Sequence, residues 1–160
     1  MNFSVARKGL LMFCGCILMA TMSLGIAASS QRVEVTLKEM PTQRGRLTVE
    51  VRNTGEKTIT IHSGNLPWSG TVFSGFQLVV LPLTGKGQGL KRVYSMRNPV
   101  GKVDLAQEQV LAGTIDLYRE FPELPDIRAK EDIVVFWCYS PATADQDRLP
   151  PIAGAVILTR

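Results

Sequence analysis

The sequence predicts an all-β fold, an immunoglobulin-like antiparallel β-sandwich of seven to nine strands that follows an N-terminal signal peptide. Apolar and polar residues alternate in short runs rich in β-branched side chains, which is typical of strands with one buried face. Turn-forming Gly, Pro and Asn recur about every ten residues between these runs, as they do in sandwiches. No amphipathic helix of useful length is found, so we expect less than about a tenth of residues 30–160 to be helical.

The first three strands are expected at residues 32–38, 46–52 and 57–63, where Val, Leu or Ile occupies every second position. The segment from Asn53 to Glu56 is a turn signal, because Asn and Gly tolerate a positive φ. We therefore expect the second and third strands to form a hairpin. His62 would then be an exposed residue at the end of the third strand.

Six further runs are strand candidates, at residues 75–83, 90–96, 102–106, 109–118, 132–140 and 152–160. The run at 132–140 is the most continuously apolar, which suits a central strand that is covered on both faces and pairs with the terminal run. Two prolines in the charged segment 119–132 argue against a long helix there. A closed barrel of the same strands is the alternative. The predicted core positions are Val35, Leu47, Val49, Val51, Ile59, Ile61, Leu78, Val80, Ile115, Leu117, Val135 and Trp137.

The signal peptide is expected over residues 1–29. Arg7 and Lys8 precede an uncharged apolar run, Gly9 to Ala28, and the small residues at its end suit signal peptidase. The run is also about long enough to cross a bilayer, so an uncleaved anchor is the alternative. Cleavage predicts a periplasmic or secreted domain over residues 30–160, with no membrane insertion after the signal peptide is removed.

Charge and cysteine content narrow the possible partners. The chain has 18 Lys and Arg against 14 Asp and Glu, and two of the basic residues belong to the expected signal peptide. Without clustered positive charge we expect no binding to nucleic acid. Cys138 is the only cysteine beyond the signal peptide, so no internal disulfide is expected. Its place in an apolar run predicts a small buried side chain.

Catalysis and metal binding find little support in the sequence. His62 is the only histidine, and no Gly-x-Ser-x-Gly elbow accompanies it. Asp145 and Asp147 share a loop with Arg148, so we expect them to be solvated rather than paired for acid–base chemistry. A copper or zinc site needs several His, Cys or Met ligands at defined spacing, whereas His62, Cys138, Met40 and Met96 are scattered beyond the signal peptide. We therefore expect no enzymatic activity, no metal and no cofactor.

Two loops are candidate surfaces for binding another protein, because sandwiches build binding surface from loops gathered at one end. In the loop at 62–70, Trp68 either covers an end of the sandwich or stands exposed with Leu66 and Pro67 as an apolar anchor. The second loop is residues 140–151. The candidate binding residues are Asn65, Leu66, Pro67, Trp68, Tyr139, Asp145, Asp147 and Arg148.

One stretch of the chain resembles known families. LTVEVRNTGEKTITI resembles the strand, Asn-Thr-Gly turn, strand element of immunoglobulin-like domains in bacterial secreted proteins, among them the small proteinase inhibitors of bacilli. Trp68, FQLVV, LKRVYSMRNP, VDLAQEQVLAGTIDL and FPEL extend the likeness to the non-catalytic domain of deuterolysin-type metalloendopeptidases, over roughly residues 33–139. The zinc motif His-Glu-x-x-His of the protease itself is absent. The resemblance implies a free-standing sandwich module that contacts or restrains another protein.

These observations predict a non-catalytic exported module that binds another protein, such as a protease, a toxin or an envelope component. A proteinase inhibitor or an immunity-type protector is the first hypothesis. The alternative is a structural or assembly accessory protein of the bacterial cell envelope.

Overall fold

The computed structural model describes residues 32–72, 74–84, 88–95, 100–144 and 149–160. The predicted signal peptide, 1–29, and the candidate residues Asp145, Asp147 and Arg148 lie outside these ranges. The described residues form antiparallel strands and a few short helices, which confirms the all-β class.

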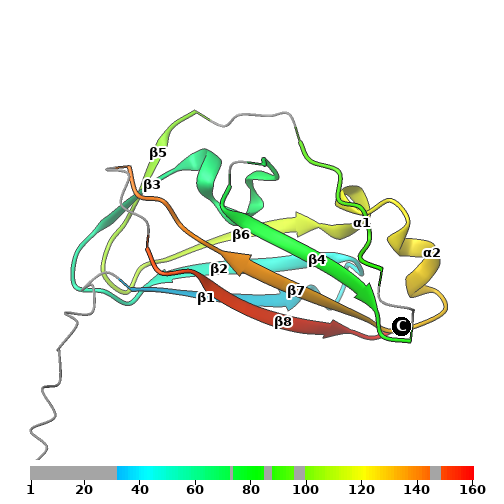
Figure 1. Cartoon of the computed structure of the whole chain (residues 1–160). Helices are drawn as coiled ribbons and strands as arrows, with labels where there is room; N and C mark the ends of the chain where they lie inside the picture. The colour runs from blue at the N-terminus through cyan, green and yellow to red at the C-terminus, as the bar shows by residue number, and fades with distance from the viewer. Residues whose placement is uncertain (1–31, 73, 85–87, 96–99, 145–148) are drawn as a thin grey trace, which may run out of the picture.

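Eight strands in the described ranges make three antiparallel sheets (Figure 1). The first sheet has the order β1 (Val33–Glu39), β2 (Arg46–Asn53), β6 (Val110–Asp116). The second pairs β3 (Ile59–His62) with β5 (Lys102–Leu105). The third has the order β4 (Phe76–Pro82), β7 (Ile133–Tyr139), β8 (Ile152–Leu158), so the predicted pairing of the two C-terminal strands is confirmed.

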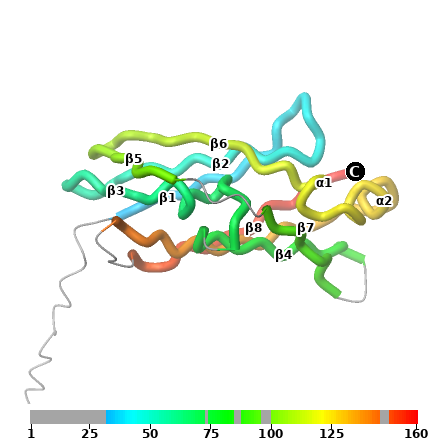
Figure 2. The backbone as a smooth tube through the Cα atoms, turned by 90° about the horizontal axis from the view of Figure 1, so that it is seen from above, coloured from blue at the N-terminus to red at the C-terminus, as the bar shows by residue number. Residues whose placement is uncertain are grey.

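The strands lie on two levels when the molecule is viewed from above (Figure 2). One level holds β1, β2, β3, β5 and β6, and the other holds β4, β7 and β8. The main hydrophobic core combines buried residues of both levels, for example Val49 of β2 and Val135 of β7. All twelve predicted core positions are buried. Eleven of them lie in strands, where alternation points every second side chain inward, and Leu117 is the first residue of a short helix.

The helices in the described ranges are short, and those in the segment 119–132 are short as its two prolines predicted. They are the 3₁₀ turns η1 (Ser63–Asn65) and η2 (Pro67–Ser69) and the α-helices α1 (Leu117–Glu120) and α2 (Leu124–Arg128). The expected strand at 109–118 ends at Asp116, whose side chain caps α1 by accepting a hydrogen bond from the Arg119 amide at 3.2 Å. No helix in the described part of the chain is long and apolar enough to span a membrane.

The predicted hairpin between the second and third strands is wrong. β2 pairs with β1 and β6, whereas β3 pairs with β5. Neither Asn53 nor Gly55 adopts a positive φ. Instead, the buried Asn53 amide donates to the carbonyls of Lys57 at 2.8 Å and Leu105 at 2.9 Å, and its oxygen accepts from the Gly55 amide. The Asn53 side chain thus directs the chain away from β2 and satisfies backbone groups that a hairpin would pair.

The predicted strand at 90–96 is also wrong for its described residues, 90–95, which form no strand. Their amides donate to three separate segments. Leu90 donates to Val80 at 3.0 Å, Val93 to Glu120 at 2.7 Å and Ser95 to Gly70 at 2.9 Å. The segment therefore crosses from β4 to α1 and then to the loop after η2, rather than following one neighbouring strand.

Candidate functional site

The loop at 62–70 folds back on the core. His62 is exposed at the end of β3, as predicted, while Leu66 and Pro67 are buried. Trp68 is partly buried and packs against both the main core and a smaller cluster. That smaller cluster consists of Ile59, Ile61, Leu66 and Leu149. With Leu66 and Pro67 enclosed, the loop does not present them as an exposed apolar anchor.

Trp68 lies directly on β6 at Gly113. A Cβ atom at position 113 would overlap the indole ring, so only glycine leaves room for Trp68 there. Gly113 is paired with Val49 of β2, so the indole lies on the first sheet and joins the loop to it. This contact gives Trp68 the covering position that the sequence offered as one of its two interpretations.

The structure brings the two candidate loops together at one end of the molecule. The Asn65 side chain donates to the Ala142 carbonyl at 3.4 Å, and the Ala144 amide donates to the Thr60 carbonyl at 2.7 Å. Ile61 and Thr143 form an isolated β-bridge. The loop at 62–70 and the described residues 140–144 of the second loop therefore form one region and not two separate surfaces.

Tyr139 lies in the core between the levels. Its side chain is fully buried, and its ring meets the ring of Phe76 edge-on with centroids 6.0 Å apart. Burial raises the pKa of the Tyr139 hydroxyl, which has no hydrogen-bond partner among the described residues. A partner protein cannot reach this hydroxyl without opening the core.

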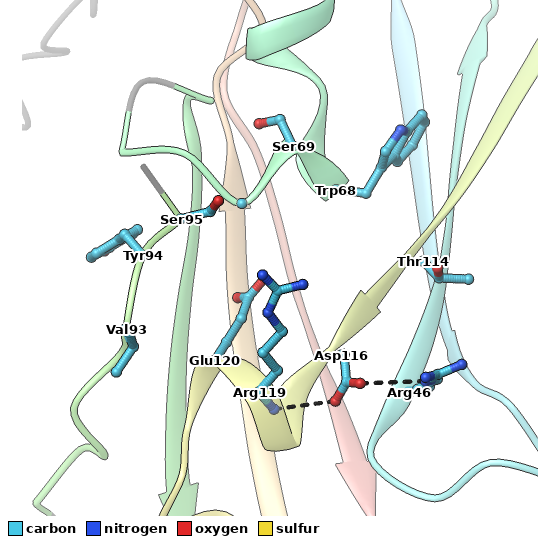
Figure 3. Close-up of a pocket in the computed structure, with 11 residues that line it drawn as sticks. Arg46, Trp68, Ser69, Val93, Tyr94, Ser95, Thr114, Asp116, Arg119 and Glu120 are labelled. Carbon is cyan, nitrogen blue, oxygen red and sulfur yellow. Dashed lines mark hydrogen bonds and ion pairs between the residues drawn. The ribbon is translucent and has the colours of Figure 1, made fainter. Parts of the chain in front are cut away.

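A cleft of about 480 Å³ opens between η2, the segment 93–95 and α1 (Figure 3). It lies beside Trp68 and combines charged groups with hydroxyls and aromatic rings. Its lining residues are Arg46, Trp68, Ser69, Gly70, Val93, Tyr94, Ser95, Thr114, Asp116, Arg119 and Glu120. Of these, the sequence analysis had singled out only Trp68.

One wall of the cleft is held by a buried ion pair between Arg92 and Glu120, whose side chains are 4% and 14% exposed. Arg92 Nε donates to Glu120 Oε2 at 2.9 Å, and Nη1 donates to the Phe76 carbonyl at 3.1 Å. Nη2 also lies 2.8 Å from the same oxygen but is not aligned for a hydrogen bond. Burial dominates over the attraction of Arg92 and raises the pKa of Glu120. The Arg92 guanidinium also lies over the Tyr94 ring, 4.9 Å from its centroid.

Two further arginines face the cleft. Arg46 Nε lies 3.4 Å from Asp116 Oδ2 in an exposed ion pair. The Arg119 side chain runs from α1 beside the Glu120 carboxylate toward the side of the cleft formed by Ser69 (Figure 3). Within the described ranges, the Arg119 guanidinium makes no hydrogen bond or ion pair, although its charge opposes the larger effect of burial, which raises the pKa of Glu120.

A second surface, which we call the outer face, is the side of the β4–β7–β8 sheet that points away from the core. Strand pairing arranges its nine residues in three rows of three. The rows are Gln77–Cys138–Ala153, Val79–Phe136–Ala155 and Leu81–Val134–Ile157. Eight of these nine positions are apolar and none is charged.

The outer face is open to solvent in the described structure. Val79 is 47% exposed, Phe136 45% and Ile157 60%. β7 is central in its sheet, as predicted, but the prediction that both of its faces are covered is wrong for the described residues. Cys138 is half-buried on the outer face, which corrects the prediction of a buried side chain.

The opposite outside of the molecule has different chemistry. Along β1 and β2 the residues that alternate with the buried positions are polar or charged. They are Glu34, Thr36, Lys38, Thr48, Glu50 and Arg52. A sheet face that stays in contact with water is usually polar, as the outside of β1 and β2 is. A contiguous apolar face is instead typical of a surface that another molecule covers.

Residues that could hold a metal ion do not gather anywhere in the described part of the chain. His62, the only histidine, has Lys102 opposite it across the β3–β5 ladder.

Comparisons with known proteins do not assign this chain to a family. No family model matches the chain, and no curated protein matches it. One similar solved structure is Northeast Structural Genomics Consortium target SoR45, with 10% identity, 83% of this chain and 89% of that chain covered, and a TM-score of 0.38. Another is a protein from Archaeoglobus fulgidus, with 12% identity, 81% of this chain and 95% of that chain covered, and a TM-score of 0.35. Both TM-scores are below 0.5, so the all-β assignment rests on the strands themselves.

Proposed function

We propose that this chain is a non-catalytic, exported, immunoglobulin-like β-sandwich that binds another protein through its outer face. The two levels of antiparallel strands with a shared core support the sandwich. The basic and apolar start of the sequence supports export to the periplasm or the exterior.

The outer face is the observation that carries the proposal. Isolated exposed apolar residues are normal, but a contiguous apolar sheet face is typical of a surface that a partner covers. Val79, Phe136 and Ala155 form its middle row, in which an aromatic ring is flanked by small aliphatic groups. Interfaces favour this composition, with aromatic residues at the centre and few charges.

The partner class follows from the resemblance to secreted inhibitors and to a non-catalytic protease domain. We propose a protease or a toxin as the partner, which makes the chain an inhibitor or an immunity-type protector. A structural component of the envelope is the second candidate, and the same experiment distinguishes the two by the identity of the retained protein.

Two exposed alanines provide a matched pair of variants for the test. Ala155 lies in the middle row of the outer face, and Ala112 lies on the polar outside, opposite Glu50. The full chain, tagged at its C-terminus and recovered after export, is immobilised and exposed to periplasmic extract. Ala155→Lys should weaken retention of the partner by about 2 kcal/mol or more, roughly 30-fold in Kd, because it places a charge in an apolar interface.

Ala112→Lys should retain the partner as the unmodified protein does. Melting curves of both variants should match that of the unmodified protein, since both positions are exposed. Equal retention by both variants would show that the partner does not bind the outer face. If the unmodified protein retains nothing, the proposal of a protein partner fails.

A further inference from the structure

The cleft beside Trp68 carries a second inference, which does not depend on the outer face. Its volume of about 480 Å³ falls in the range of small-molecule sites. Backbone hydrogen bonds fix its walls, because the Val93 amide donates to Glu120 at 2.7 Å and the Ser95 amide donates to Gly70 at 2.9 Å. The cleft is therefore formed in the protein before any ligand arrives.

Among the described residues around the cleft, one cation has no ion-pair partner. Arg92 is paired with Glu120, and Arg46 is paired with Asp116. Arg119 remains, with no hydrogen bond or ion pair to its guanidinium from the described residues. One negative charge on a ligand would balance this surplus, and a guanidinium binds a planar carboxylate with two parallel hydrogen bonds.

Most of the remaining lining is polar, with Ser69, Ser95 and Thr114 among it. In Figure 3 the rings of Trp68 and Tyr94 point away from the Arg119 guanidinium. We propose that the cleft binds a small organic acid through one carboxylate, which Arg119 holds.

Benzoate is the probe, and benzamide, which has the same shape without the charge, is its control. Binding is followed at constant ionic strength by the NMR shift of the Trp68 indole N–H, with the Trp137 indole as internal reference because Trp137 is buried in the core. We expect benzoate to move the Trp68 signal and to bind at least about tenfold more tightly than benzamide, because a hydrogen bond to a charged group is lost in the amide.

Arg119→Gln should weaken benzoate binding by about tenfold or more, while Arg119→Lys should keep part of the affinity because the charge remains. Arg52→Gln is the control variant, since Arg52 is an exposed arginine of the polar outside. Ala155→Lys should bind benzoate normally, which separates this test from that of the outer face.

Three results would overturn the proposal. One is equal affinity for benzoate and benzamide. The second is an affinity for benzoate that Arg119→Gln leaves unchanged. The third is no shift of the Trp68 signal in the unmodified protein at millimolar benzoate. Tighter binding of inorganic phosphate than of benzoate would assign the cleft to a phosphate ligand instead.

Discussion

Two buried arginine–glutamate pairs hold different parts of this molecule, and they are built differently. Arg128 of α2 contacts both carboxylate oxygens of Glu39, one of them at 2.6 Å, and also donates to the Thr159 carbonyl. Arg92, beside the cleft, makes one aligned hydrogen bond to one oxygen of Glu120. The first pair joins β1 to the chain end after β8, so it links the two levels of strands. The second forms the wall of a cleft.

The pKa of each glutamate reflects this difference. Burial alone would raise the pKa of Glu39, but the hydrogen bond and charge of Arg128 and the hydrogen bond from the Gly45 amide together lower it. Burial of Glu120 dominates, so its pKa is raised although Arg92 is adjacent. A neighbouring opposite charge therefore does not by itself stabilise a buried carboxylate. The balance between burial and hydrogen bonding decides the sign: Glu120 is more buried than Glu39, at 14% against 22% exposed, and accepts fewer hydrogen bonds.

The largest expected effect comes from Arg128→Met. The substitution removes the guanidinium while keeping most of the side-chain volume, and it takes the Arg128 donors away from Glu39 and from the Thr159 carbonyl. We expect the free energy of unfolding to fall by about 3 to 4 kcal/mol, measured by urea denaturation at neutral pH. A loss below about 1 kcal/mol, the range of exposed pairs, would contradict the role of this pair in joining the two levels.

Arg92→Met should lower the free energy of unfolding by less, about 2 kcal/mol. Fewer aligned hydrogen bonds are lost, and Glu120 takes up a proton more readily because its pKa is already raised. The same denaturation experiment measures it. An equal loss of unfolding free energy in Arg92→Met and Arg128→Met would contradict the difference between the two pairs that their geometry indicates.

The two glutamates should also respond to pH with opposite signs. The pKa of Glu39 is lowered below its ordinary value of 4.5, so the ionised Glu39 carboxylate stabilises the folded protein at pH values above 4.5. This stabilisation is lost as pH falls through the folded pKa. The pKa of Glu120 is raised, so the protein loses stability as pH rises from about 4.5 through the folded pKa.

Relative to the unmodified protein, Glu39→Gln should therefore become less stable as pH rises, and Glu120→Gln should become more stable. Urea midpoints measured from acidic to neutral pH check both variants. Parallel curves for the two variants would contradict the opposite pKa directions.

The smallest effect is expected for Arg52→Met. Arg52 Nη2 lies 2.5 Å from Glu108 Oε2, but both side chains are about half exposed, at 47% and 54%. Exposed pairs contribute about 0 to 1 kcal/mol, so the free energy of unfolding should hardly change. A loss of unfolding free energy above about 2 kcal/mol, the value expected for Arg92→Met, would mean that the short distance between the two charged groups determines the strength of an ion pair more than burial does.

The sequence predicted the strands and the inward positions well, because alternation depends on local geometry alone. It did not reveal the ion pairs, since Glu39 and Arg128 are separated by 89 positions and nothing near either residue marks the other. The sequence favours a strand at 90–95, yet the amides of this segment donate to three different segments, which only the tertiary structure determines. The continuously apolar run around Phe136 indicated burial on both faces, but one of them is exposed.

The candidate site was predictable only in part. The loop at 62–70 was recognised, and its tryptophan does line the cleft. Arg119 and Glu120 lie in a segment that the sequence described only as charged and rich in proline. Their place beside Trp68 depends on where β6 ends and α1 begins, at the cap formed by Asp116.

The contact between Trp68 and Gly113 has a consequence for the history of this chain. Because a side chain at 113 and the indole at 68 cannot occupy the same space, position 113 is not free to change while the tryptophan is present. A lineage that gains a side chain at position 113 must first lose the tryptophan or move the loop that carries it. Among descendants of a common ancestor, we expect glycine at 113 wherever tryptophan is present at 68.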